Sequence, residues 1–540
     1  MRIGAIAITS VFLGLIVFGL LVSALPVLWP TSQETNSAIW QEFFAYPGIM
    51  RSVGISLFAG LGSTFLAFIA AMIICAGLFV RDVQARNMKM LPVALAAPHA
   101  AIAIGLTFLL APSGFVFRVI AQIFDHERPL GLPIMPDAYG VGLLMGLFLK
   151  ELPFLLIIVL VTQQNLGLRK HYHLGLSLGY PPISAWFTCI APQIYPRMRL
   201  AVYVVLAYAL SVVDMAKILA PNAPSPLAVV VQNWHHDPSL QAEQLAAVGV
   251  VMQFLLVWGG FVLWWLGERA CKHLYYLWVV QGWRGRRVHG VLLRVSIILD
   301  WFWKLTTLAA LLILILWAFA WRWRFPDIMP QDMGLNMWVR HGGDILVTIL
   351  TSVIIAMFCI AIAFCVLLII LEDGLVGQSS LLLPLLLPQV AFLFGVQSLF
   401  VTLNIDATLW AVIFMHGFFV IPYMYLALAG SWHALDPRMI ILASTLGAGP
   451  WRIVWQVKIP MVKHVIALSL AVGFAVSIAE YLPTLVAGVG RVETLATQAV
   501  ALAGQQDYRM AGILAMLQAI LPMMGFMILL LLGHKQEGRQ

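Results

Sequence analysis

The chain has 540 residues, of which 62% are hydrophobic and only 10% are charged. Soluble globular proteins hold roughly 45–50% apolar and about 25% charged residues, so this composition excludes a soluble enzyme and predicts a membrane protein. The net charge of +8 fits loops that touch an anionic lipid leaflet and does not imply a nucleic-acid partner. The five cysteines follow neither metal-ligand nor disulfide spacing, so no metal site is predicted from them.

Twelve apolar runs are long enough to span a bilayer, which takes about 20 mostly apolar residues in a helix. In chain order the runs lie at 4–27, 52–80, 91–111, 138–162, 199–220, 245–267, 297–321, 344–371, 379–402, 407–429, 464–484 and 509–533. The first run exceeds the apolar region of a secretory signal and is predicted to remain as a helix. We therefore expect an all-α polytopic membrane protein with about twelve transmembrane helices.

Basic residues predict the orientation of these spans. With the amino terminus inside, the inner loops and tails hold roughly 20 of the 31 Lys and Arg residues, as the positive-inside rule requires. Both termini are therefore predicted to be cytoplasmic. The most basic loop, 268–296, joins the two halves of the chain, and its arginines alternate with tyrosines and tryptophans. This pattern is typical of a linker that lies among lipid headgroups.

The two halves of the chain share the spacing of their glycines and prolines. Gly179 precedes Pro192 by thirteen residues, and Gly447 precedes Pro460 by the same number. Because each half has six spans, the copies share one orientation and form a parallel repeat. Further matched pairs are Pro98 with Pro388 and Gly105 with Gly395. The predicted units are a first repeat at 1–267 with its core at 52–267, a linker at 268–296, and a second repeat at 297–540 with its core at 344–533.

The loop after the tenth span reads LDPRMIILASTLGAGPWRIVWQVKIP, residues 435–460. It predicts a short helix from Pro437, a break from Gly447 to Pro450, and a second short amphipathic helix from Trp451. Such a knob could merely connect two spans, or it could act as a lever for a cytoplasmic partner that offers acidic groups to Arg452. The recurrence of the same spacing in both halves favours the lever.

This loop resembles the "EAA" loop in the membrane subunits of type I ABC importers, which reads Glu-Ala-Ala, three residues, Gly, nine residues, Ile, any residue, Leu-Pro. The segments 435–438, 445–448, 450–452 and 459–460 look especially like the fused, double-length permeases of the ferric-iron, thiamine and related importers. The first acidic position of the family is Ile441 in the second copy and His173 in the first. The first loop, 173–192, keeps only the spacing from glycine to proline.

The resemblance implies that each loop docks into a groove on one of two copies of a cytoplasmic ABC ATPase, which binds ATP and Mg. An extracytoplasmic solute-binding protein would deliver a small solute, such as thiamine, ferric iron or a polyamine, to this permease in the bacterial inner membrane. The chain itself is then a transport subunit and not an enzyme, and needs no cofactor. No glycine precedes a lysine in it, so it lacks a phosphate-binding GxxxxGK[ST] loop. The residues assigned to the coupling loops are His173, Gly175, Gly179, Pro192, Asp436, Arg438, Ala443, Gly447, Pro450, Trp451, Arg452 and Pro460.

Charged residues within the spans need an explanation, because each costs roughly 2.5–3.5 kcal/mol on insertion scales. Asp214 and Lys217 are three residues apart and could neutralise each other on one helical face. Glu480 lies 20 residues after Pro460, much as Asp214 lies 22 residues after Pro192. The two acids could therefore converge near the pseudo-twofold axis, where a cationic substrate could pass. Helix packing, or a place near the outer interface, is the alternative.

Three more ionisable residues complete the predicted translocation pathway. Lys150 and Glu151 are consecutive, so they project about 100° apart and are expected to face protein or a cavity. His416 is a further candidate, although a single intramembrane histidine more often packs with hydrogen bonds across helices. A His-His-Asp sequence at 235–237 lies in an outer loop, where solvated side chains are a better explanation than metal ligands.

Two other functions compete with the importer permease. A twelve-helix secondary transporter could use Asp214 or Glu480 for proton coupling, but nothing in that class requires paired glycine-to-proline loops. A membrane enzyme, such as a lipid-linked transferase, would need clustered carboxylates or a nucleophile and base at one membrane face. The acidic residues of this chain are scattered.

Overall fold

The computed structural model describes residues 2–28, 36–84, 91–129, 135, 137–373, 378–505 and 507–537. Apart from one two-stranded ribbon, all regular elements in these ranges are helices. In the ribbon, β1 (Ala320–Arg322) pairs antiparallel with β2 (Asp332–Met333), and Ala320 lies opposite Met333. The prediction of an all-α polytopic protein is confirmed for the described residues in all but this short ribbon.

The helices fall into two series of similar order. The first series is α1 (Arg2–Leu28), α2 (Asn36–Ala45), α3 (Ile49–Val80), α5 (Leu91–Ala96), α6 (His99–Leu110), α7 (Phe115–Ile123), α8 (Val141–Asn165), α9 (Arg169–Ser177), α10 (Pro182–Ala185), the π-helix η1 (Trp186–Ile190), α11 (Ala191–Ser211), α12 (Asp214–Leu219), α13 (Leu227–His236) and α14 (Leu240–Val280). The second series is α15 (Arg286–Phe319), α16 (Asn336–Arg340), α17 (Gly342–Asp373), the 3-10 helix η2 (Gln378–Leu382), α18 (Leu383–Leu386), α19 (Gln389–Thr402), α20 (Leu409–His433), α21 (Pro437–Thr445), α22 (Pro450–Ile453), the π-helix η3 (Val454–Lys458), α23 (Ile459–Met461), α24 (Lys463–Ala479), α25 (Leu482–Gly488), α26 (Leu495–Gly504) and α27 (Tyr508–Glu537).

Nine helices of the described residues are long and apolar enough to cross a membrane, or up to eleven if each of two bent pairs is one span. The bent pairs join residues 380–386 to α19 at 109° and residues 450–461 to α24 at 86°. Each of the twelve predicted runs overlaps helical residues. The fifth run falls on α11 and α12, and α11 is not among the nine. A total of twelve spans stays a prediction.

Prolines set the breaks at equivalent places in the two series. Pro98 precedes α6 with φ −63° and ψ 156°, and Pro388 precedes α19 with φ −59° and ψ 126°. A proline ring fixes φ and removes a backbone donor, so a helix ends before it and a new one can begin directly after it. The matched prolines of the sequence therefore correspond to matched helix breaks.

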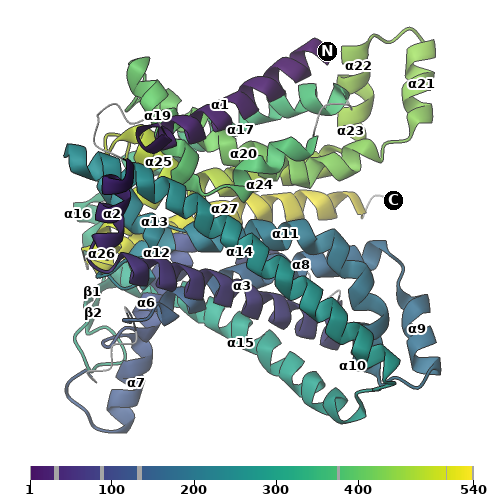
Figure 1. The fold of residues 1–540 in the computed structure, drawn as a ribbon, viewed down its shortest axis with the longest axis horizontal. Helices are drawn as coiled ribbons and strands as arrows, with labels where there is room; N and C mark the ends of the chain where they lie inside the picture. Colours follow the sequence, from purple (N-terminus) through teal and green to yellow (C-terminus); the bar gives the residue numbers. More distant parts are fainter. Residues whose placement is uncertain are drawn as a thin grey trace.

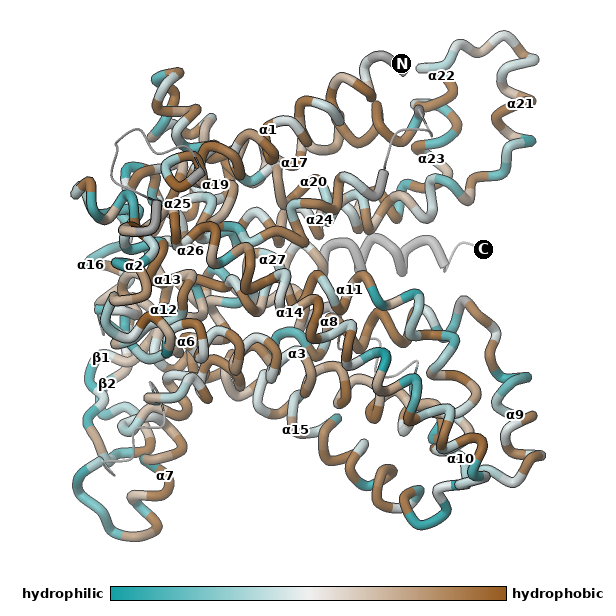
Figure 2. Tube along the Cα trace, viewed as in Figure 1, coloured by the Kyte–Doolittle hydropathy of each residue, from teal (hydrophilic) through white to brown (hydrophobic). Residues whose placement is uncertain are grey.

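The helices form two groups that spread apart toward one end of the molecule (Figure 1). One group contains α17, α20 and α24 with α21–α23 at its tip, and the other contains α3, α8 and α11 with α9 and α10 at its tip. The opposite end carries α2, α13, α16, α26 and the β-ribbon. Hydrophobic residues dominate the helices between the two ends, while hydrophilic residues gather toward the ends (Figure 2). The start of α1 lies at the same end as α21 and α22.

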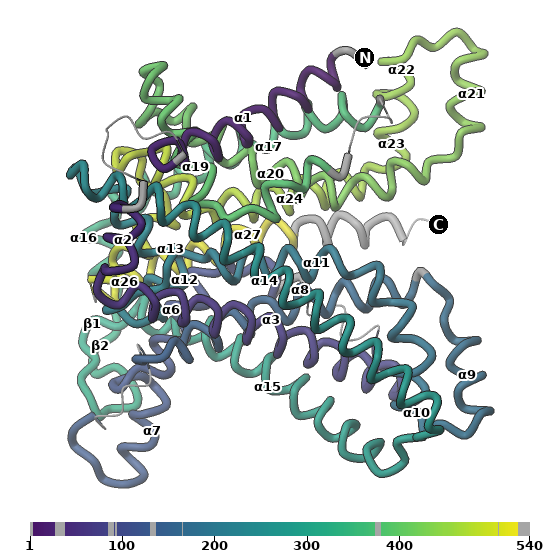
Figure 3. The backbone as a smooth tube through the Cα atoms, viewed as in Figure 1, coloured from purple at the N-terminus to yellow at the C-terminus, as the bar shows by residue number. Residues whose placement is uncertain are grey.

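The first helix of each series packs on the opposite group. α1 lies along α19 and α17, while α15 lies along α3 and α6 (Figure 3). Glycines bring the backbones together: a Cβ atom on Gly395 would lie 2.1 Å from the carbonyl oxygen of Gly19, and one on Gly105 would lie 2.2 Å from that of Ala310. Small residues permit this approach in membrane helices, where close packing stabilises helix association. The crossings of α1 on α19 and of α15 on α6 therefore form a clasp between the two series.

Candidate functional site: a cavity and two loops

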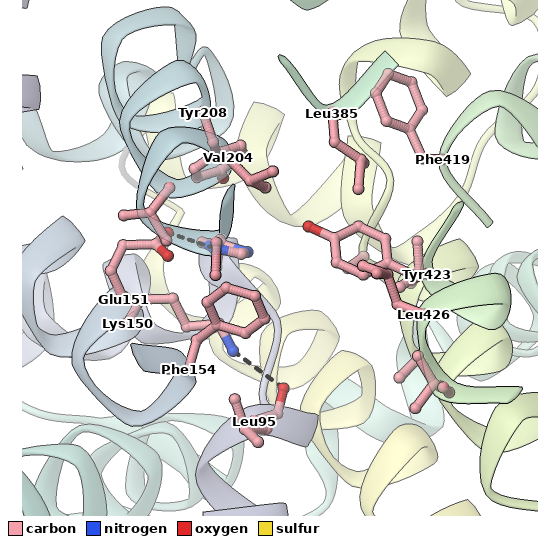
Figure 4. A pocket seen from close by; sticks show the side chains of 18 of the residues that line it. Leu95, Lys150, Glu151, Phe154, Val204, Tyr208, Leu385, Phe419, Tyr423 and Leu426 are labelled. Carbon is pink, nitrogen blue, oxygen red and sulfur yellow. Dashed lines mark hydrogen bonds and ion pairs between the residues drawn. The ribbon is translucent and has the colours of Figure 1, made fainter. Parts of the chain in front are cut away.

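A cavity of about 1470 Å³ lies between the two groups of helices (Figure 4). Its wall comes from the α5–α6 break, α8, α11 and α12 on one side, and from α18, α20 and α24 on the other. The lining extends along α24 from Lys463 to Glu480, a length of about 25 Å at 1.5 Å per residue. Two exposed residues of the lining lie next to the loops: Lys463 follows α23 in the chain, and Arg197 follows η1. The mouth of the cavity therefore faces the end of the molecule that carries α9 and α21.

Lys150 stabilises the helix break on the first wall. Its Nζ donates hydrogen bonds to the carbonyl oxygens of Ala94 at 3.3 Å, of Leu95 at 3.1 Å and of Ala97. These carbonyls lie where α5 ends, and the last turn of a helix leaves its carbonyls without intrahelical partners. Figure 4 shows the Lys150 side chain directed at Leu95. The ammonium group is thus occupied by the backbone, although the side chain lines the cavity.

A continuous polar chain runs along the same wall. The Glu151 carboxylate lies 3.4 Å from His99 Nε2, and the His99 ring lies 4.6 Å from the Tyr208 ring, measured between centroids. The Tyr208 hydroxyl donates a hydrogen bond of 3.2 Å to Asp214 Oδ1. Four different helices, α8, α6, α11 and α12, contribute these side chains. Two hydrogen-bonded pairs, joined by the contact between the His99 and Tyr208 rings, therefore place two acids on one wall of a cavity that is otherwise largely apolar.

Asp214 and Glu480 occupy equivalent breaks on the two sides of the cavity. Asp214 is the first residue of α12, directly after the interruption at 212–213, and Glu480 follows α24 with φ −67° and ψ 109°. Both residues line the cavity. Among the described residues, no hydrogen bond or ion pair involves the Glu480 carboxylate. The structure thus brings together the two acids that the repeat spacing related.

Tyrosines are the cavity residues that the sequence analysis missed. Tyr208, Tyr423 and Tyr481 all line the cavity, and the Tyr423 hydroxyl points from α20 toward the opposite wall in Figure 4. The adjacency of Tyr481 to Glu480, and of His99 to Pro98, was the signal in the sequence. Tyr208 and Tyr423 carried none, because aromatic residues are common in apolar helices.

The predicted pairing of Asp214 with Lys217 is wrong. No ion pair joins them in the described part of the chain; Lys217 Nζ instead lies 5.8 Å from the ring centroid of Tyr481, across the two groups of helices. The Asp214 carboxylate instead accepts a hydrogen bond from the Tyr208 hydroxyl. Sequence spacing placed the two charges on one helical face, but tertiary neighbours supplied other partners for both.

His416 lies outside the cavity. Its side chain is 1% exposed, and its ring nitrogens lie 2.9 Å from Ser477 Oγ and 2.8 Å from Thr484 Oγ1. These contacts tie α20 to α24 and α25, which fits the packing interpretation rather than the pathway. His235, from the His-His-Asp sequence, stacks on Phe394 at 3.7 Å. The described residues contain no group of three His, Cys, Asp or Glu side chains placed to hold a metal ion.

The two predicted loops have the same backbone geometry. α9 and α21 each contain nine residues, and Gly179 and Gly447 follow them with φ of +82° and +84°. The amide of Tyr180 donates to the carbonyl of Gly175 at 3.2 Å, and that of Ala448 donates to Ala443 at 3.1 Å. This is the Schellman helix end, in which the residue after the last turn takes a left-handed conformation that favours glycine. The recurring glycine and the small residue four positions before it are thus explained.

The first helix of the second loop begins at the predicted residue. α21 starts at Pro437, with Asp436 Oδ1 accepting from the Arg438 amide at 2.9 Å as an N-cap. The second helix starts at Pro450, one residue before the predicted Trp451. In both loops a four-residue helix leads into a five-residue π-helix. Pro192 and Pro460 then lie in the first turn of α11 and of α23.

The helix α21 of the second loop has no buried residue, whereas the helix α9 of the first loop is partly buried. The exposed apolar side chains of α21 include Ile441 at 60% and Leu442 at 56%. Leu446, at 79%, and Trp451 extend this surface. In the first loop His173 is exposed, but Gly175 is buried against Cys189 and Ala185. The exposed apolar surface of the second loop is typical of a contact face for another protein.

The described helices and the cavity between them define a polytopic membrane protein that has one large internal site and two matched loops at one end. The chain is similar to the inner membrane ABC transporter permease protein YnjC of Escherichia coli (strain K12), with 29% identity over 531 residues. This similarity covers 96% of the chain and 95% of that protein. No family model and no solved structure matches the chain.

Proposed function

We propose that this chain is the permease subunit of an ATP-driven, binding-protein-dependent importer of the type I ABC class, located in the bacterial inner membrane. The observation that carries the proposal is the pair of loops with equal helix lengths and equal Schellman ends, one on each group of helices around a single cavity. The similarity to a protein named as an inner membrane ABC transporter permease supports it over nearly the full length. Two parallel six-helix repeats account for the recurring order of elements.

In this proposal two copies of a cytoplasmic ATPase bind the loops. The exposed apolar residues of α21 and Leu446 enter a groove on one copy, and α9 meets the other. ATP and Mg bind to the ATPase pair, whose closure pulls the loops together and with them the two groups of helices. The cavity, whose mouth faces the loops, then closes on that side and opens toward the binding protein. The fold represents the inward-open state of this cycle.

We further propose that the solute is a cation. Deep in the cavity three carboxylates, those of Glu151, Asp214 and Glu480, face one ammonium group, that of Lys150, which donates to backbone carbonyls. Arg197 and Lys463 also line the cavity, but they lie at the exposed mouth, where salt screens them within about 10 Å. No partner of the Glu480 carboxylate is found among the described residues; such a group is costly to keep charged in a membrane, and a bound cation offsets that cost. Tyrosine rings add favourable cation–π contacts.

A substitution at the elbow of the second loop tests the coupling. Gly447→Pro should abolish the ATP hydrolysis that the solute and binding protein stimulate, because proline cannot adopt a φ of +84° and removes the amide that donates to Ser444. Gly449→Pro is the matched control, since Gly449 has a φ of −69° and the first loop has Pro181 at that position. Copurification with an ATPase is the prerequisite. Equal stimulation in the two variants would refute the coupling role.

Uptake into proteoliposomes tests the pathway. Glu480→Gln should lower the uptake of a cationic solute by about tenfold, the equivalent of about 1.4 kcal/mol, without loss of the assembled complex. Glu493→Gln, an exposed residue outside the cavity, should leave uptake unchanged. If Glu480→Gln also transports normally, the cationic pathway is wrong. Uptake that needs no ATPase and follows a proton gradient would instead support a proton-coupled secondary transporter.

A further inference from the structure

The basic linker between the two halves lies against the first loop. The linker 268–296 consists of the end of α14, a turn at 281–285, and the start of α15. The Tyr275 hydroxyl donates to the carbonyl of Thr188 at 2.9 Å, and the Ser184 hydroxyl lies 3.5 Å from the carbonyl of Gly285. Figure 1 shows the turn between α14 and α15 next to α10. Lipid headgroups are therefore not the only neighbours of this segment.

Arg284 covers the elbow of the first loop. A Cβ atom on Gly179 would lie 2.9 Å from Arg284 Nη1 and 3.5 Å from its guanidinium carbon. The Arg284 residue is nevertheless exposed, so its guanidinium can still meet another protein. Around Gly447, the equivalent glycine of the second loop, a Cβ atom would meet nothing within 4 Å. The linker thus adds a cation to one elbow only.

After its elbow glycine, the first loop has no cation that corresponds to Arg452 of the second loop. In the second loop Arg452 lies five residues after the elbow glycine and is exposed, with its Nε donating to Gln456 at 2.9 Å. The residue five positions after Gly179 is Ser184, which is buried and contacts the residue next to Arg284. No Lys or Arg occurs between 171 and 196. Arg284 therefore lies beside the position where the first loop lacks the arginine of the second.

We propose that Arg284 of the linker completes the first coupling loop, and that it meets the ATPase there as Arg452 does at the second loop. The inference rests on the proposed function, in which two copies of one ATPase present two identical grooves. Identical grooves require a similar charge from both loops, although the loop sequences differ. An arginine pairs with a carboxylate through two parallel hydrogen bonds. The partner group is thus a carboxylate of the ATPase groove, and the linker is part of the docking surface.

Alanine substitutions in the linker and in the second loop test this inference on the complex of the chain with the ATPase that copurifies with it. Arg284→Ala and Arg452→Ala should each lower stimulated ATP hydrolysis by about tenfold, equivalent to about 1.4 kcal/mol, and Arg284→Lys should restore part of the loss. Arg286→Ala is the matched control, because it removes an equal charge from an exposed residue of the same linker. All variants should retain the thermal stability of the parent protein.

The outcomes separate the inference from the proposed function. If Arg452→Ala impairs hydrolysis but Arg284→Ala behaves like Arg286→Ala, the linker is not part of the docking surface and the coupling loops stand. If neither Arg284→Ala nor Arg452→Ala has an effect, the arginine-to-carboxylate docking is refuted at both loops. A loss of thermal stability in Arg284→Ala that Arg284→Lys does not repair would assign Arg284 a purely structural role and overturn the inference.

Discussion

The crossing of α1 over α19 allows a sharp test of the clasp between the two halves. Gly19 is buried at this crossing, and a Cβ atom on it would lie 2.3 Å from the carbonyl oxygen of Phe392. Gly14 lies on the same helix, is exposed, and has nothing within 4 Å of its Cβ position. Gly19→Ala should therefore destabilise the protein, while Gly14→Ala should not.

The size of the effect follows from the distances. Ordinary Cβ contacts begin at 3.4 Å, so the helices must separate by about 1.1 Å at Gly19, and the group in the way is backbone rather than a flexible side chain. Overpacking of this kind costs about 1–3 kcal/mol. Both substitutions gain the same helix propensity of about 1 kcal/mol for glycine to alanine. The difference between the two variants should therefore be about 2 kcal/mol.

The assay is the free energy of unfolding in a mixed-micelle denaturation titration of the purified chain, with the two variants measured side by side. Gly395→Ala, from the other side of the crossing, should behave like Gly19→Ala, because its Cβ atom would lie 2.1 Å from the Gly19 carbonyl oxygen. Equal free energies for Gly14→Ala and Gly19→Ala would show that α1 does not pack closely on α19. The clasp would then be refuted.

Two further substitutions probe the cavity and its surroundings. Lys150→Met should lower the free energy of unfolding by about 2 kcal/mol, because it leaves the carbonyls of the α5–α6 break without their donor; Lys463→Met, at the exposed mouth, should have little effect on the same titration. Equal losses in the two variants would contradict the capping role of Lys150. His416→Leu should cost about 1–2 kcal/mol through its lost bonds to Ser477 and Thr484, yet uptake per folded molecule should match the parent. If His416→Leu has normal stability but impaired uptake, His416 belongs to the translocation pathway.

The unequal loops have a physical consequence for the fused chain. The second loop, which contains α21 and the elbow at Gly447, exposes its apolar residues and Arg452. The linker instead contacts the first loop through the Tyr275 hydroxyl, which donates to the carbonyl of Thr188, and through the carbonyl of Gly285, which lies 3.5 Å from the Ser184 hydroxyl. The covalent connection between the halves is therefore also a structural support for one of the two loops.

The features that the sequence determined by itself are local ones. Apolar runs of about 20 residues predict helices in a bilayer, and each overlaps helical residues here. Gly447 predicted a helix end because a left-handed residue favours glycine whatever surrounds it, and Gly179 has the same spacing to its loop proline. The spacing of Asp214 and Glu480 from their loop prolines also predicted equivalent places for the two acids in the two repeats.

The tertiary structure alone decided which side chains meet. Lys217 Nζ lies over the ring of Tyr481, a residue of the second half of the chain, and no ion pair joins Lys217 to Asp214 among the described residues. Nothing in the order of the spans places α1 on α19 or Arg284 on the first loop. Contacts between residues far apart in the chain depend on how helices pack, and one sequence without its fold does not fix that packing. The local backbone followed from the residues, and the composition of the cavity wall followed from the assembly of both halves.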